Sequence, residues 1–278
     1  MILRPIDPQS PASLRPEAAL LAKMTKSLPA GDGFVPAWSV VAEKQGAEAS
    51  RFLLVNQPDH AKLAGELAAA FRAGFLPKIG EEIARGIGVH DEGWAQFPCE
   101  RDLQLEPSLN GGRPKSFLEV TVDESLAAWT GSIEAGAKVS PVGESMVSAH
   151  FSRIGRMRLS MNTDSEADRR KVDEFVEHED ARQKRLAQRI GLSDRELSAY
   201  VDLLQFCDVL SLYLCCGAIE SVEFPQTFSG HKIRIRHEDG VYVSTPSLFA
   251  ETQRFSLPLR LYPSGNGGAV TRIGIHVE

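Results

Sequence analysis

The sequence is poor in cysteine and has no long continuous apolar run. Its 278 residues include four cysteines, which form no CxxC pair. Three of them lie in one apolar segment, where reduced cysteine packs as a small hydrophobe, so we do not expect thiolate metal ligands. No run approaches the length of a membrane span, and the first residues lack the apolar stretch of a secretory signal. We therefore expect a cytoplasmic protein without a membrane partner.

The sequence also lacks an excess of positive charge. Its formal net charge is −6, and binding to nucleic acid usually depends on a basic surface that neutralises phosphates. Residues 182–189 are basic but interrupted, and acidic residues precede them, which is typical of a solvated helix with internal charge pairs. We therefore expect no nucleic-acid partner. The sequence contains no internal repeat or low-complexity tract.

The hydrophobic pattern changes twice along the chain and predicts an α+β fold. Residues 1–56 contain two short strand-like pieces, 38–42 and 51–55, expected to pack on the core as a small sheet. Residues 57–218 are mostly helical and contain every candidate functional residue. Residues 219–278 alternate between apolar and polar positions, with Asp239-Gly240 as a hairpin signal. The expected organisation is an N-terminal strand segment, a helical metal-binding domain and a β-rich C-terminal region.

The pair His90-Asp91 is the most informative local feature. In a helix that continues from Ile83 through Ile87 to Trp94, both residues of the pair fall on the apolar face. A carboxylate directed into an apolar interior is costly unless it is paired, hydrogen-bonded or bound to a metal. The pair therefore predicts a partner elsewhere in the chain.

Two further helical segments carry the same anomaly. His60 begins an apolar stripe, and Pro58 suits the first turn of that helix. Asp208 lies in the most apolar helix of the chain, among polar residues that recur every three positions and face either water or a polar site. Alone, His60 reads as a core histidine and Asp208 as a solvent-facing residue, and Asp91 could simply end its helix. Together, these imidazoles and carboxylates suit a divalent ion such as Zn, Mn, Fe or Co.

The order of these four residues resembles a known family. His60, the adjacent His90-Asp91 and the distant Asp208 resemble the H…HD…D signature of the HD-domain superfamily of metal-dependent phosphohydrolases. More narrowly, the phrases VNQPDHAKLAG, IGVHDEGWAQF, GGRPKSF, SAHFSRI and LLQFCDVLSLYLCC resemble a bacterial family of unknown function related to that superfamily. The resemblance covers roughly residues 50–220.

The resemblance implies a mainly helical HD-like bundle in which His60, His90, Asp91 and Asp208 hold the metal. The implied cofactor is one or two divalent ions, of Mn, Fe, Zn, Co or Mg. Such an ion activates water and polarises a phosphoryl oxygen, which implies hydrolysis of a phosphate ester or anhydride, with nucleotides as one option. The lysine that often follows the HD pair is missing, so the usual substrate class is not carried over.

Two residues of one later segment complete the predicted site. His150 lies at the edge of an apolar face and is expected to bind a second metal or to hydrogen-bond the substrate, although a core histidine is the alternative. Arg153, one turn further, is a candidate phosphate clamp, with ordinary surface charge as the alternative. His178 is expected on a solvated helix face.

Two alternatives to a phosphohydrolase remain open from the sequence. A di-iron oxygenase would need additional histidines, for which His150 and His178 are the candidates. A catalytically degenerate protein would bind a small ligand and turn nothing over. The expected partner is a small phosphorylated molecule. Substrate, metal identity and number, formation of a homo-oligomer and the role of the β-rich region stay open.

Overall fold

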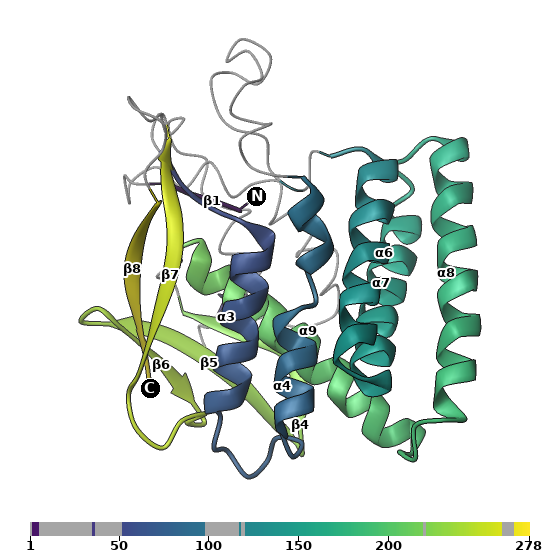
Figure 1. Ribbon diagram of the computed structural model, residues 1–278. Helices are drawn as coiled ribbons and strands as arrows, with labels where there is room; N and C mark the ends of the chain where they lie inside the picture. Colours follow the sequence, from purple (N-terminus) through teal and green to yellow (C-terminus); the bar gives the residue numbers. More distant parts are fainter. Residues whose placement is uncertain are drawn as a thin grey trace.

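The chain folds into an α+β protein with a helical core, as the sequence predicts. The structure is a computed structural model that describes residues 2–5, 35–36, 52–97, 117, 120–218, 221–262 and 270–278. The strand expected at 38–42 lies outside these residues. In Figure 1 the strands of the C-terminal region form one side of the molecule, and the helices form the middle and the other side.

The helices follow the apolar periodicity of the middle of the chain. The first begins with a proline in its first turn, and two others begin with a capping box, so local sequence signals set several of the helix starts. Their bounds are α3 (Gln57–Ala70), α4 (Glu81–Gly88), the 3₁₀ helix η2 (Glu92–Gln96), α6 (Val122–Val139), α7 (Pro141–Met161), α8 (Glu166–Ala187) and α9 (Asp194–Cys215).

Strands from both ends of the chain join in one sheet. Its order is β1-β3-β7-β8-β6-β5-β4-β2. The expected N-terminal sheet is therefore not separate, because β3 pairs with β7 in antiparallel register. The strands are β1 (Ile2–Pro5), β2 (Val35–Pro36), β3 (Phe52–Val55), β4 (Val222–Phe228), β5 (His231–Glu238), β6 (Val241–Thr245), β7 (Gln253–Tyr262) and β8 (Val270–Val277).

Two tight hairpins connect neighbouring strands of this sheet. At the predicted turn between β5 and β6, Asp239 and Gly240 have φ angles of 49° and 85°. Ser229 and Gly230 make a second turn between β4 and β5, with φ angles of 48° and 83°. Positive φ at both central residues matches the right-handed twist of the strands. Of these two turns, only the one at Asp239-Gly240 is predicted from the sequence.

Helix α9 lies in the core between the other helices and the sheet. Its Phe206 ring lies 6.0 Å from Phe71 of α3 and 5.3 Å from Phe224 of β4, centroid to centroid. By length and composition α9 could cross a membrane, which corrects the expectation that no run approaches such a span. Most of its apolar stretch, 67%, is buried inside the protein. A buried core helix meets the same criterion.

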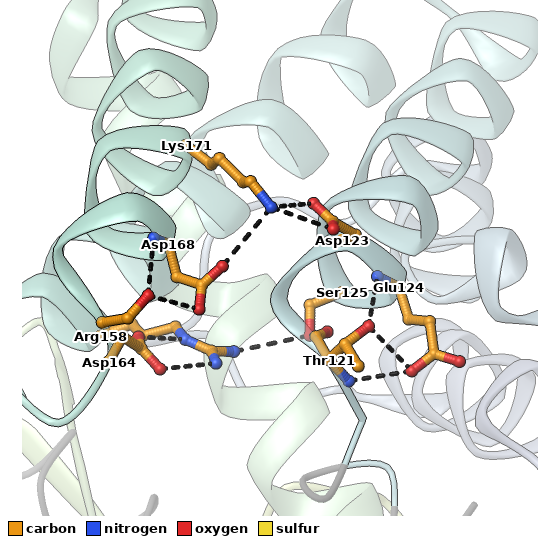
Figure 2. Close-up of polar contacts among 9 residues, drawn as sticks. Thr121, Asp123, Glu124, Ser125, Arg158, Asp164, Asp168 and Lys171 are labelled. Carbon is orange, nitrogen blue, oxygen red and sulfur yellow. Dashed lines mark hydrogen bonds and ion pairs between the residues drawn. The ribbon is translucent and has the colours of Figure 1, made fainter.

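Polar contacts connect the ends of α6, α7 and α8, as Figure 2 shows. Thr121 caps α6 through a capping box. Lys171 of α8 reaches Asp123 of α6 at 2.8 Å, and Arg158 of α7 pairs with Asp164 at 2.7 Å. Because most of these groups are partly exposed, each contact adds little stability by itself.

A second polar group joins α7 to α8 in a more buried position. Arg182 places Nη1 2.8 Å from Glu144 Oε1 and Nε 2.8 Å from Glu179 Oε2. The Glu179 side chain is only 3% exposed. We call these three residues the glutamate–arginine cluster. Its buried carboxylate has a cationic partner within the protein.

Candidate metal centre

Five of the six predicted site residues converge in the interior of the helical region. His60 comes from the first turn of α3, His90 and Asp91 from the turn between α4 and η2, His150 from α7 and Asp208 from α9. We call these five residues the histidine–aspartate cluster. They are separated by up to 148 positions in the chain, so only the tertiary fold brings them together.

His90 and Asp91 do not lie on a helix that continues to Trp94, as the sequence analysis expected. Helix α4 ends at Gly88, and the His90 amide donates to the Ile87 carbonyl at 3.2 Å, which closes a tighter turn. Glycine disfavours continuation of a helix, which explains the end at this position. Asp91 precedes η2 without capping it through its side chain. Both side chains are thus directed by a turn.

Close backbone contacts fix the segments that carry these ligands. A Cβ at Gly65 of α3 would lie 2.6 Å from the Gly88 Cα of α4, so these helices cross at glycines. A Cβ at Gly93 would lie 1.9 Å from the Ala128 carbonyl oxygen of α6, and the Gly93 amide donates to Ser132 Oγ at 3.0 Å. Only glycine permits these approaches. They set the positions of the backbones near His60 and Asp91.

The distances within the cluster match those between ligands of one ion. His60 Nε2 lies 3.2 Å from Asp91 Oδ2 and 3.4 Å from Asp208 Oδ1. His90 Nε2 lies 3.5 Å from Asp208 Oδ1, and His150 Nε2 lies 3.7 Å from Asp208 Oδ2. Donors bound at about 2.0 to 2.2 Å to one ion would stand about 3.0 to 3.5 Å apart. The spacing leaves room for a cation between the donors.

The cluster forms two overlapping groups of three donors. His60, His90 and Asp91 make one group, and His90, His150 and Asp208 make the other; within each, the donor atoms lie within 4.8 Å of one another. The three imidazoles are 0% to 1% exposed, whereas the two carboxylates are 9% and 11% exposed. The carboxylates therefore provide the side of the cluster that is nearest to solvent.

The outward-facing nitrogens of two histidines are hydrogen-bonded to neighbouring groups. His60 Nδ1 lies 2.7 Å from Ser211 Oγ, and that hydroxyl donates to the Asp208 carbonyl at 2.9 Å. His90 Nδ1 donates to the Ile87 carbonyl at 2.8 Å. Because a carbonyl only accepts, a neutral His90 carries its proton on Nδ1 and a lone pair on Nε2. Hydrogen bonds of this kind orient imidazole ligands in metal sites.

Charge within the cluster shifts the acidity of its members in opposite directions. Burial alone would lower the pKa of His90, but the Asp91 and Asp208 carboxylates raise this pKa to about 9. Burial lowers the pKa of His150 to about 4, against the opposing effect of Asp208. Burial opposes ionisation of Asp208, yet its contacts with the histidines lower its pKa to about 2. The Asp208 carboxylate thus attracts a cation or a proton into this interior.

The sixth predicted site residue, Arg153, is engaged by α9. Its Nη1 donates to Asp202 Oδ1 at 2.6 Å and to Gln205 Oε1 at 2.7 Å. Asp202 and Gln205 precede Asp208 and Ser211 in the polar stripe of α9. The stripe therefore faces α7 and the cluster rather than water alone, which decides an alternative that the sequence left open. Arg153 already has a carboxylate partner, so a role as phosphate clamp would require this contact to open.

His178, the other histidine considered from the sequence, lies away from the cluster. Its side chain on α8 is 63% exposed and lies 3.9 Å from Glu179. A surface hollow between α7 and α8 is lined by residues outside the cluster, among them Arg182, Arg185 and Arg189. The sequence analysis did not assign Ser211 a role, although its place in the three-residue polar repeat was a usable signal.

The fold and the cluster define an α+β protein with three histidines and two aspartates buried together in a helical core. The chain belongs to the family described as protein of unknown function (DUF3891), whose model matches residues 45–261. No curated protein and no solved structure gave a match.

The family comparison corrects the resemblance to the HD-domain superfamily. The matching model is DUF3891, and no HD-domain family matches the chain. The resemblance depended mainly on four residues in the order His, His-Asp and Asp, and so short a pattern can occur in unrelated helical proteins. A metal centre is therefore inferred from the geometry of the cluster alone.

Proposed function

We propose that this protein is a metal-dependent hydrolase whose ion is held by the histidine–aspartate cluster. The observation that carries the proposal is the convergence of three buried imidazole Nε2 atoms on two carboxylates at 3.2 to 3.8 Å. A purely structural cluster of this kind would be costly, because burying charged groups usually costs more than their pairing returns. A bound cation offsets the two carboxylates directly.

The donor set indicates which ions suit the cluster. Imidazole nitrogens and carboxylate oxygens together favour Zn, Mn, Fe or Co, with Mg as a harder alternative. In the proposal His60, His90, Asp91 and Asp208 are the ligands. His150 either completes a second ligand group or hydrogen-bonds the substrate, since its Nδ1 has no hydrogen-bond partner among the described residues.

A divalent ion in this cluster would activate water and polarise the bond to be broken, which fits a phosphate ester or anhydride as substrate. The chain's own residues would position that chemistry. The buried imidazoles keep bulk water from the inner side of the cluster, and the partly exposed Asp91 and Asp208 leave an approach for a small molecule.

A di-iron oxygenase is the second candidate, and one observation favours it. Asp208 presents Oδ1 to His60 and His90 and Oδ2 to His150, so its two oxygens could serve two adjacent ions. The further histidine that this alternative needs is not supplied by His178, which is exposed on α8. The metal content decides between the candidates, because two equivalents of iron would favour the oxygenase.

The test is metal content by mass spectrometry, on protein purified without chelators or a metal-affinity tag. We expect one or two equivalents of a transition metal in the wild type. Asp91→Ala and Asp208→Ala should lose the metal, and they should also lose the ability to hydrolyse phosphomonoester, phosphodiester and nucleotide substrates. Asp202→Ala is the matched control, because this carboxylate pairs with Arg153 outside the cluster. Retention of metal in folded Asp91→Ala and Asp208→Ala would contradict the ligand assignment.

A further inference from the structure

Ser211 lies buried at the point where α3 and α9 meet behind the cluster. It is 0% exposed, and its hydroxyl contacts two proposed metal ligands, His60 through the imidazole and Asp208 through the backbone carbonyl. The hydroxyl lies 2.7 Å from His60 Nδ1 and 2.9 Å from the Asp208 carbonyl oxygen. A serine hydroxyl has a single proton to donate, so the direction of these two bonds is coupled.

The Ser211 hydroxyl donates to the Asp208 carbonyl, which can only accept. When the Ser211 proton is donated to this carbonyl, the short contact with His60 is a hydrogen bond only if Nδ1 carries a proton. His60 Nε2 is then the nitrogen that presents a lone pair to Asp91 and Asp208, at 3.2 and 3.4 Å. In this arrangement every one of these polar atoms has a partner once a cation occupies the cluster.

We propose that Ser211 is a positioning residue that sets the tautomer of His60 and so prepares its Nε2 for metal binding. This inference rests on the proposed metal centre, and it adds a residue that contacts no ion itself. For His90 the backbone carbonyl of Ile87 sets the tautomer, because it accepts a hydrogen bond from Nδ1. His150 differs, because its Nδ1 has no such partner among the described residues. The protein thus presets two of the three histidines of the histidine–aspartate cluster.

The experiment measures metal affinity by competition with a chelator in wild type, Ser211→Ala and Ser148→Ala. Ser148 is the matched control, because it is a fully buried helical serine that bonds Gln183 instead of the cluster. We expect Ser211→Ala to weaken zinc or cobalt binding about 10- to 100-fold, as loss of such a partner typically does. Ser148→Ala and Ser211→Thr, which retains the hydroxyl, should bind like the wild type.

A spectroscopic readout separates positioning from a merely structural role. Imidazole ¹⁵N NMR should show a proton on His60 Nδ1 of the wild type, both with and without zinc, and its protected signal should be lost in Ser211→Ala. Unchanged affinity in Ser211→Ala, or a zinc-loaded His60 that is protonated on Nε2, would overturn the proposal. Failure of the wild type to bind any metal would overturn the proposed function instead, while the Nδ1 signal would still test Ser211 in the metal-free protein.

Discussion

Two buried charged groups of this protein balance their charges differently. In the glutamate–arginine cluster, the single Arg182 guanidinium lies 2.8 Å from both Glu144 and Glu179. In the histidine–aspartate cluster, Asp91 and Asp208 contact imidazoles, and no Lys or Arg contacts them among the described residues. Each carboxylate of the first cluster thus contacts a permanent cation of the protein, whereas those of the second can take up a proton or a metal cation. A buried carboxylate that no Lys or Arg side chain contacts is therefore informative about function.

The change with the largest expected effect breaks the histidine–aspartate cluster through its backbone. In Gly93→Ala the new methyl would overlap the Ala128 carbonyl oxygen, at 1.9 Å, so η2 must move away from α6. We expect a loss of about 3 kcal/mol in the free energy of unfolding, together with weaker metal binding because Asp91 moves. Denaturant unfolding and metal content measure both effects.

Gly74→Ala is the control for that change, because nothing lies within 4 Å of a Cβ at this position. It should leave stability and metal content close to those of the wild type. A Gly93→Ala protein with wild-type stability and full metal content would mean that contact between η2 and α6 does not position Asp91.

The next change breaks the glutamate–arginine cluster instead. Glu179→Gln removes a nearly buried carboxylate beside Arg182, which keeps Glu144 as a partner. We expect a loss of about 2 kcal/mol in the free energy of unfolding, because a charge-assisted contact is lost in a desolvated place. Metal content should be unchanged, because the carboxylates of this cluster already contact Arg182. Glu177→Gln, an exposed site two residues away on the same helix, is the control; loss of metal in Glu179→Gln would remove the contrast between the clusters.

The smallest expected effect concerns the exposed contacts of Figure 2. Thr121→Ala removes the side chain that accepts from the Glu124 amide at the start of α6. We expect a cost of about 1 kcal/mol in thermal or denaturant unfolding, which is typical of a lost helix cap, without a change in metal content. Thr121→Ser keeps the cap and should behave like the wild type. If Thr121→Ala costs well above about 1 kcal/mol, the exposed contacts of Figure 2 stabilise the fold more than their exposure indicates.

Local patterns were sufficient to predict several elements of the fold. The proline near the start of α3 and the apolar period of α9 predict helices there, and Asp239-Gly240 predicts the turn between β5 and β6. These signals act over a few neighbouring residues, so they are readable in the sequence. The end of α4 at Gly88 was missed, because the apolar period of this segment continues past the point where the backbone turns.

Local patterns indicated which residue types could form a metal centre, namely histidines and aspartates on otherwise apolar segments. The packing of distant segments is what brings together His60, His90, Asp91, His150 and Asp208, pairs Arg153 with α9 and joins β3 to β7. These facts depend on contacts between segments far apart in the chain. Such contacts follow from packing and close glycine crossings, for which a local pattern contains no distance information.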